Sequence, residues 1–108
     1  MRLLPALAFA ALLLDTSPLN AQDLPGDPVA GLEFARQICA ECHYVERQWA
    51  DLYVHEAPSF IDVAENSDHN EMSLRVFFVT PHLTMPNLRL TDEQTDNVIS
   101  WILSLRED

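Results

Sequence analysis

Residues 39–43 read "CAECH" and place Cys39, Cys42 and His43 in one short segment. Both cysteines of the 108-residue chain lie here, and the histidine directly follows the second. A Cys-x-x-Cys pair occurs in covalent haem attachment, in redox-active dithiols and in zinc sites. A structural disulfide is a fourth possibility. The choice among these four chemistries decides whether the rest of the chain folds around a haem, a metal ion or neither.

Haem attachment uses all three residues of this segment. Two thiols one helical turn apart can add across the two vinyl groups at one edge of a porphyrin, and an imidazole in the next position then lies under the iron. The segment therefore predicts one haem c, covalently bound through Cys39 and Cys42, with His43 as an axial ligand of the haem iron.

The other three chemistries account for less of the sequence. A redox dithiol uses a thioredoxin-like βαβ frame, and no segment alternates apolar and polar residues for long enough to form a strand. Zinc needs about two further ligands, whereas His55, His69 and His82 are scattered along the chain. A disulfide between such close cysteines would close a very small loop and add little stability. The CxxC dithiol stays the alternative that contains no haem.

A six-coordinate electron carrier needs a second axial ligand on the opposite face of the haem. Met85 is favoured because it lies in an irregular, proline-containing segment that can pass over a flat ring. His82 is the second choice. Met72 belongs to the apolar pattern of a helix, where filling the core is the more common role. His69, like His55, is expected at the surface.

The first residues, "MRLLPALAFAALLLDTSPLNAQ", have the order of a secretory signal peptide. A single charge at Arg2 precedes an apolar run from Leu3 to Leu14, and the polar segment that follows ends at the small residue Ala21. The apolar run is shorter than the roughly 20 residues of a membrane-spanning helix. We expect a signal peptide over 1–21, a linker over 22–27, a haem-binding domain over 28–108 and a periplasmic location.

The chain is strongly acidic, with 17 Asp and Glu against 6 Lys and Arg and a net charge of −11. All six basic residues are arginine. This balance argues against nucleic acid and anionic lipid as partners, because both need positive charge on the protein. It suits redox partners with basic docking surfaces, although acidity also keeps a small exported protein soluble.

Helix signals occur at four places, and we expect an all-α fold of about four helices around one haem. Asp27 and Pro28 begin a helix that runs to about residue 42. Residues 58–66 predict a short helix. Thr91 and Gln94 form a capping box at the start of the last helix. The apolar stripe of that helix consists of Val98, Trp101, Ile102 and Leu105.

The remaining helix is expected over 70–81, with Asn70 as its cap and Pro81 as its stop. Its apolar members are Met72, Val76, Phe77 and Val79. Residues 44–57 show no clear period, so the sequence predicts no structure for them.

With these features the chain resembles the class I cytochromes c, small monohaem electron carriers, over about residues 27–106. The segments that carry the resemblance are "GLEFARQICAECH" (31–43), "APSF" (57–60), "TPHLTMPNLRL" (80–90) and "DNVISWILSL" (96–105). The resemblance implies a cytochrome c-like fold in which the first and last helices cross, with Gly31 on one approaching an aromatic residue, Trp101, on the other.

The resemblance also implies several contacts around the haem. The carbonyl of Pro58 would accept a hydrogen bond from the free ring nitrogen of His43 and so fix the imidazole. The candidate wall residues of the haem crevice are Phe60, Leu74, Phe77, Leu83 and Leu88.

Two features depart from the family pattern. Residues 44–57 contain no glycine, and Arg47, Trp49 and Tyr53 are candidates to bind the propionate edge of the haem. Mitochondrial relatives dock through lysines, which this chain lacks, so their partners cannot be carried over.

The expected function is transfer of single electrons between larger redox proteins, without the substrate chemistry of an enzyme. Histidine and methionine ligation favours the ferrous form and raises the reduction potential. The rival haem function is a peroxidase or gas sensor with an open sixth site, for which His82 is the nearest acid–base side chain.

Overall fold

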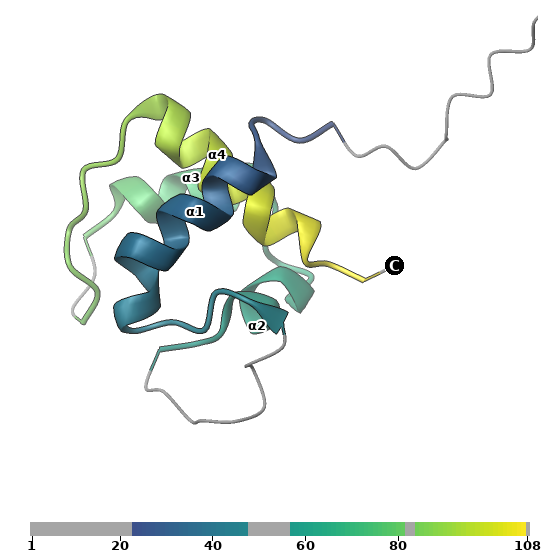
Figure 1. Ribbon diagram of the computed structural model, residues 1–108, viewed down its shortest axis with the longest axis horizontal. Helices are drawn as coiled ribbons and strands as arrows, with labels where there is room; N and C mark the ends of the chain where they lie inside the picture. Colours follow the sequence, from purple (N-terminus) through teal and green to yellow (C-terminus); the bar gives the residue numbers. More distant parts are fainter. Residues whose placement is uncertain (1–22, 48–56, 82–83, 108) are drawn as a thin grey trace, which may run out of the picture.

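The computed structural model describes residues 23–47, 57–81 and 84–107. Within these ranges the chain forms four α-helices and a single 3-10 turn, without a strand. Helix α1 (Pro28–Ile38) crosses α4 (Asp92–Ser104), and α2 (Phe60–Glu65) and α3 (Glu71–Val79) also pack against α4 (Figure 1). The expected all-α architecture is confirmed.

Side-chain caps define the starts of the helices. The carboxylate of Asp27 accepts hydrogen bonds from the backbone at the start of α1, which has Pro28 in its first turn. Capping boxes begin α3 at Asn70 and α4 at Thr91, as the sequence predicts. Ser59 caps α2, so this helix begins at Phe60 and not at residue 58 as expected.

Helix α1 ends at Ile38, earlier than expected, and continues as the 3-10 turn η1 (Cys39–Glu41). The carbonyl of Cys39 accepts hydrogen bonds from the amides of both Cys42, at 3.2 Å, and His43, at 2.9 Å. A tighter turn of this kind is common at the C-terminus of a helix. It keeps the two cysteines on one compact turn directly before the histidine.

Gly31 allows α1 and α4 to approach until their backbones touch. A Cβ atom at Gly31 would lie 1.9 Å from the carbonyl oxygen of Asn97 and 3.0 Å from the amide nitrogen of Val98. Any side chain here would push the helices apart. The nearest neighbours of Gly31 are these backbone atoms of α4, and the expected approach of Trp101 to Gly31 stays a prediction.

The segment before α1 is attached to α4. The amide of Gly26 donates a 2.7 Å hydrogen bond to Oγ of Ser100, and the amide of Asp27 donates one of 2.8 Å to Oδ1 of Asn97. The hydroxyl of Ser100 in turn donates to the carbonyl of Asp96, at 2.7 Å. Part of the expected linker over 22–27 thus contacts the helical domain.

The core lies where α1, α2 and α3 meet α4. Val98 and Ile99 are completely buried. The other buried apolar residues are Ala35, Cys39, Val45, Phe60, Ala64, Leu74, Ile102 and Leu105. The last helix therefore supplies the centre of the fold, as its apolar stripe predicts.

Helix α3 buries the face opposite to the one its apolar residues suggest. Leu74 is buried, whereas Met72 is 68% exposed, Val76 54% and Val79 83%. The prediction that Met72 fills the core is wrong. The side chain of Arg75 pairs with Asp96 on α4 at 2.6 Å, which helps to fix the rotation of α3 about its axis.

Two arginines tie the C-terminal end of the chain to the rest of the domain. Arg106 donates to the carbonyls of Ala64, at 2.8 Å, and His69, at 2.5 Å. Arg47 donates to the carbonyl of Leu105 and forms an ion pair with Glu107 at 3.1 Å. The chain after α4 is thereby held beside α2.

His69 is half-buried, and its Nδ1 atom lies 2.8 Å from the carbonyl of Val63. The expectation that His69 is a simple surface residue is therefore corrected.

None of the helices in the described ranges combines the length and apolar character needed to cross a bilayer. The expected signal peptide over 1–21 lies outside the described residues.

Candidate functional site

The two cysteines differ in exposure. Cys39 is buried at the end of α1, Cys42 is exposed, and both are free thiols. Burial raises the pKa of the Cys39 thiol to about 11. Redox-active dithiols instead have a nucleophilic cysteine with a lowered pKa. The thiol of Cys39 thus faces the core, and the thiol of Cys42 faces solvent.

The ring of His43 is held by the segment that leads into α2. Its Nδ1 atom lies 2.6 Å from the carbonyl oxygen of Pro58. Because a carbonyl can only accept, Nδ1 carries the hydrogen and Nε2 keeps a lone pair for a metal ion. The hydrogen bond that the resemblance implies is thus present in the structure.

Phe60 packs beside the same imidazole. The ring centroids of His43 and Phe60 are 5.4 Å apart, with an interplanar angle of 51°. The amide of Phe60 also donates a 2.8 Å hydrogen bond to the carbonyl of Tyr44. The hydrogen bond to the carbonyl of Pro58 and the packing against the ring of Phe60 together orient the ring of His43.

The residues after the motif are fixed from two further directions. Nε1 of Trp101 donates a 2.8 Å hydrogen bond to the carbonyl of the buried residue Val45. Arg36 on α1 forms an ion pair with Glu46 at 2.5 Å. The sequence carries no signal for the Arg36–Glu46 pair, because Glu46 lies in a segment without periodicity.

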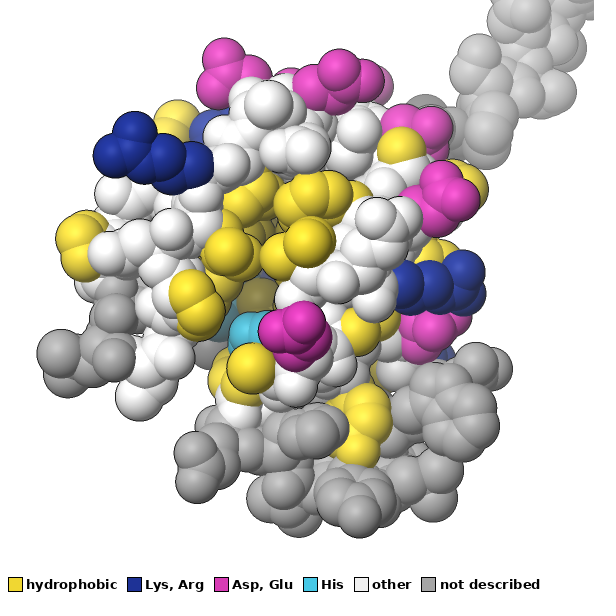
Figure 2. Space-filling view, turned by 60° about the vertical axis from the view of Figure 1, so that its left-hand side comes forward, with side chains coloured by type: hydrophobic (Ala, Val, Ile, Leu, Met, Phe, Trp, Pro, Cys, Tyr) yellow, Lys and Arg dark blue, Asp and Glu magenta, His cyan; other side chains and the backbone are white. Residues whose placement is uncertain are grey.

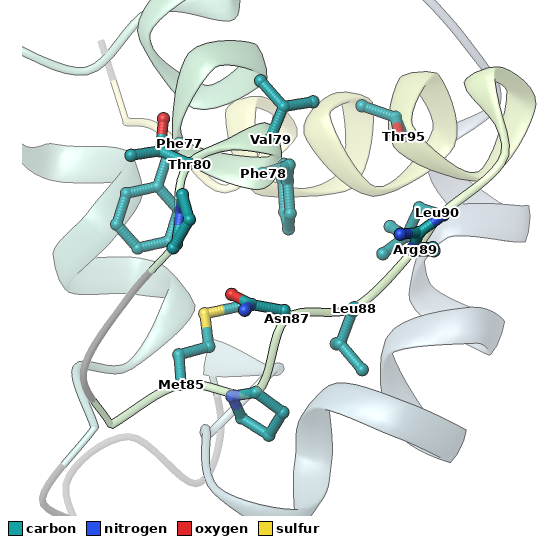
Figure 3. A pocket seen from close by; sticks show the side chains of 12 residues that line it. Phe77, Phe78, Val79, Thr80, Met85, Asn87, Leu88, Arg89, Leu90 and Thr95 are labelled. Atoms are coloured by element: carbon teal, nitrogen blue, oxygen red, sulfur yellow. The ribbon is translucent and has the colours of Figure 1, made fainter.

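Met85 lies in the segment between α3 and α4, beside a cavity of about 420 Å³. Figure 3 shows Phe77 and Phe78 on the α3 side of this cavity and Met85 and Asn87 on the opposite side. Met85 is half-buried, and so is Leu88, which also lines the cavity. The full lining is Phe77, Phe78, Val79, Thr80, Pro81, Met85, Pro86, Asn87, Leu88, Arg89, Leu90 and Thr95.

The expected site residues thus fall into two groups. Cys39, Cys42, His43, Pro58 and Phe60 form one cluster around the end of α1. Met85 belongs to the cavity, whose lining includes none of that cluster. One face of the molecule is hollowed, with apolar side chains and a histidine exposed in the hollow (Figure 2).

Several expected site residues have other positions or no described position. Leu83 and His82 lie outside the described residues, as do Trp49, Tyr53 and His55. Arg47, a candidate for the propionate edge, is bonded to Leu105 and Glu107 instead. Trp101 donates a hydrogen bond to the carbonyl of Val45, just after the motif, and it is not among the residues that line the cavity.

The donor set fits a haem better than a closed metal site. Within the described ranges no three His, Cys, Asp or Glu side chains converge to hold a metal ion, as tetrahedral zinc would require. An imidazole with a free Nε2, two thiols on one turn, a thioether and apolar walls are the groups that a c-type haem uses.

Comparison with known proteins identifies the family of the chain. No family model and no solved structure matches the chain. A similar protein is cytochrome c-552 of Bradyrhizobium diazoefficiens, which is 30% identical over 95 residues that cover 88% of this chain and 90% of the relative. Identity of this extent, along nearly the whole of both proteins, shows that the chain belongs to the class I monohaem cytochromes c.

Proposed function

We propose that this electron-transfer haem protein is a periplasmic carrier of single electrons and not an enzyme. One haem c is covalently bound to Cys39 and Cys42, and its iron is ligated by His43 and Met85. The observation that carries the proposal is the 2.6 Å contact between Nδ1 of His43 and the carbonyl of Pro58. Bound at this site, the haem supplies an iron that alternates between the ferrous and ferric states.

The cysteines attach the haem at two depths. The side chain of Cys39 lies in the core with Ala35 and Ile99, whereas Cys42 lies at the surface. A porphyrin edge that meets both sulfur atoms would pass from the core to solvent. One edge of the haem would therefore stay accessible to a redox partner.

His43 acts through its fixed orientation. The hydrogen bond to Pro58 selects the tautomer with a free Nε2 and makes the ring a stronger electron donor. Phe60 packs against the ring and would restrict its rotation. A ligand held in this way keeps its geometry when the iron changes its oxidation state, so electron transfer needs little rearrangement.

Met85 would supply a thioether from the opposite side. Methionine ligation raises the reduction potential of a haem. The apolar side chains along the cavity, Phe77, Phe78 and Leu88, would exclude water from that face. The pairing of His43 with Met85 therefore suits a carrier that is readily reduced.

Export and partner charge complete the proposal. The leader over 1–21 would direct the chain to the periplasm, with cleavage after Ala21. A net charge of −11 would attract redox partners with basic surfaces.

The test is the optical spectrum of the freshly purified ferric protein. A weak far-red band is characteristic of ferric haem with a thioether ligand, and the proposal expects this band. A high-spin ferric spectrum would instead favour an open sixth site, as in a haem peroxidase or a gas sensor. A colourless protein from cells competent in cytochrome maturation would favour the CxxC dithiol.

A further inference from the structure

The arginines of the chain differ in whether their side chains have partners within the protein. Four of the five that follow the leader are engaged within the protein. Arg36 pairs with Glu46, Arg47 with Glu107, Arg75 with Glu71 and Asp96, and Arg106 with the carbonyls of Ala64 and His69. These positive charges are therefore largely neutralised or committed to the fold.

Arg89 is different. It is exposed, and among the residues that the structure describes it has neither an ion pair nor a side-chain hydrogen bond. It also lines the cavity that contains Met85 (Figure 3). In a chain with net charge −11 and no lysine, this makes Arg89 an isolated positive charge on the lining of the cavity that Met85 also lines.

Exposed apolar side chains line the same cavity as Arg89. Val79 lines the same cavity and is 83% exposed, and Pro86 is also exposed. Val76, on the same face of α3 as Val79, is 54% exposed. Figure 2 shows hydrophobic side chains around the hollow face, acidic side chains along its upper and right-hand margins, and one acidic side chain beside the histidine. An exposed apolar patch rimmed by polar residues is typical of an interaction surface.

We propose that Arg89 is the point at which a redox partner protein places an acidic side chain, with Val79, across the same cavity, in the apolar part of the contact. This inference rests on the proposed function. The acidic remainder of the chain attracts a partner of overall positive charge at long range, and the single cation then orients it at short range. Arginine suits this role because its planar group binds a carboxylate through two hydrogen bonds.

A contact of a few side chains suits electron transfer, because electron-transfer encounters bury the smallest areas among specific protein interfaces. Such an interface needs correct orientation more than high affinity, because the partners must separate after each electron. One buried carboxylate–arginine pair within an apolar contact meets this need.

The experiment measures the oxidation of the ferrous holoprotein by two small oxidants of opposite charge. Hexacyanoferrate(III) carries negative charge and tris(phenanthroline)cobalt(III) carries positive charge, and each takes one electron from the ferrous protein. Rates are measured by stopped flow at low and at high salt for the wild type and for Arg89→Gln. At low salt we expect Arg89→Gln to slow hexacyanoferrate(III) roughly three- to tenfold while the cobalt complex stays within about twofold. The difference should vanish at high salt.

The matched control is Asn66→Asp, which changes the net charge by the same amount at the end of α2. The new aspartate can still accept the hydrogen bond from the amide of Asp68 that Asn66 accepts at 2.9 Å. If Arg89 acts locally, this control changes the hexacyanoferrate(III) rate by less than about twofold. Equal effects of the two variants would reduce the role of Arg89 to net charge and overturn the inference.

Four other outcomes would also overturn it. A shift of the reduction potential in Arg89→Gln, with both oxidants affected, would assign Arg89 to the haem propionates. A dimer of the wild type in sedimentation that Arg89→Gln dissociates would assign the surface to a second copy of the chain. A wild type without the haem spectrum would overturn the proposed function as well, whereas a normal spectrum with unchanged rates in Arg89→Gln would overturn the inference only.

Discussion

Nδ1 of His43 lies 2.6 Å from the carbonyl oxygen of Pro58, although the two residues are separated by a segment of the sequence without periodicity. The contact joins the end of the haem-attachment motif to the start of α2. It leaves Nε2 of His43 as the ring atom available to iron. The account of this protein as an electron carrier depends on that arrangement.

The tautomer of His43 can be observed directly. In the ferrous, diamagnetic protein we expect the Nδ1 hydrogen of His43 to exchange slowly, because it is donated to the carbonyl of Pro58, while Nε2 carries no hydrogen. Nitrogen-15 NMR of histidine-labelled protein measures both. His69, whose Nδ1 faces the carbonyl of Val63, is an internal reference. A hydrogen on Nε2 of His43 would rule out the proposed ligand geometry.

Replacement of Met85 by alanine should remove the sixth ligand. The expected result is loss of the far-red band and a fall in reduction potential on the order of 0.1 V, a fraction of the range that axial ligands cover. Spectroscopy and redox titration measure these changes. Met72→Ala is the matched control, because Met72 is 68% exposed on α3 and should leave both properties unchanged. A far-red band that survives in Met85→Ala would assign the sulfur ligand to another residue.

Gly31→Ala should destabilise the crossing of α1 and α4. The added Cβ would meet the carbonyl oxygen of Asn97 at 1.9 Å, so the helices must separate. We expect a loss of about 1–3 kcal/mol in the free energy of unfolding, as for other overpacked sites. Denaturant titration measures it, with Val29→Ala as the control at a position that is 70% exposed. Equal stability of Gly31→Ala and the wild type would show that the crossing is looser than the structure indicates.

Local signals allowed the helices to be predicted well. Asp27, Asn70 and Thr91 cap the helices that the sequence assigns to them. These caps depend on residues only two or three positions away, so the sequence contains all the information needed. The CxxCH motif is local in the same sense.

Features that depend on distant contacts were predicted less well. Helix α3 carries two apolar stripes, one with Met72, Val76 and Val79 and the other with Leu74, and helical spacing does not tell which one faces α4. The backbone neighbours of Gly31 were not predicted for a similar reason, since only the crossing of two helices brings the backbone of Asn97 to it. The isolation of Arg89 likewise emerges only once the partners of the other arginines are known.

Ser100→Ala should loosen the segment before α1. Ser100 is completely buried, and its hydroxyl accepts the hydrogen bond from the amide of Gly26. Loss of this acceptor should cost about 0.5–1.5 kcal/mol and accelerate hydrogen exchange at Gly26, which NMR detects. The control is Ser104→Ala, at an exposed position where the hydroxyl donates to the carbonyl of Trp101 in its own helix. Unchanged exchange at Gly26 would contradict the described attachment.

The central claim is that a haem is covalently bound through Cys39 and Cys42. The most direct measurement is the intact mass of the protein, purified from the periplasm of cells competent in cytochrome maturation and then denatured in acid. The account predicts a chain cleaved after Ala21 that retains the mass of one haem, and a double variant, Cys39→Ala with Cys42→Ala, that retains none. A correctly processed wild-type chain without any porphyrin mass would contradict it.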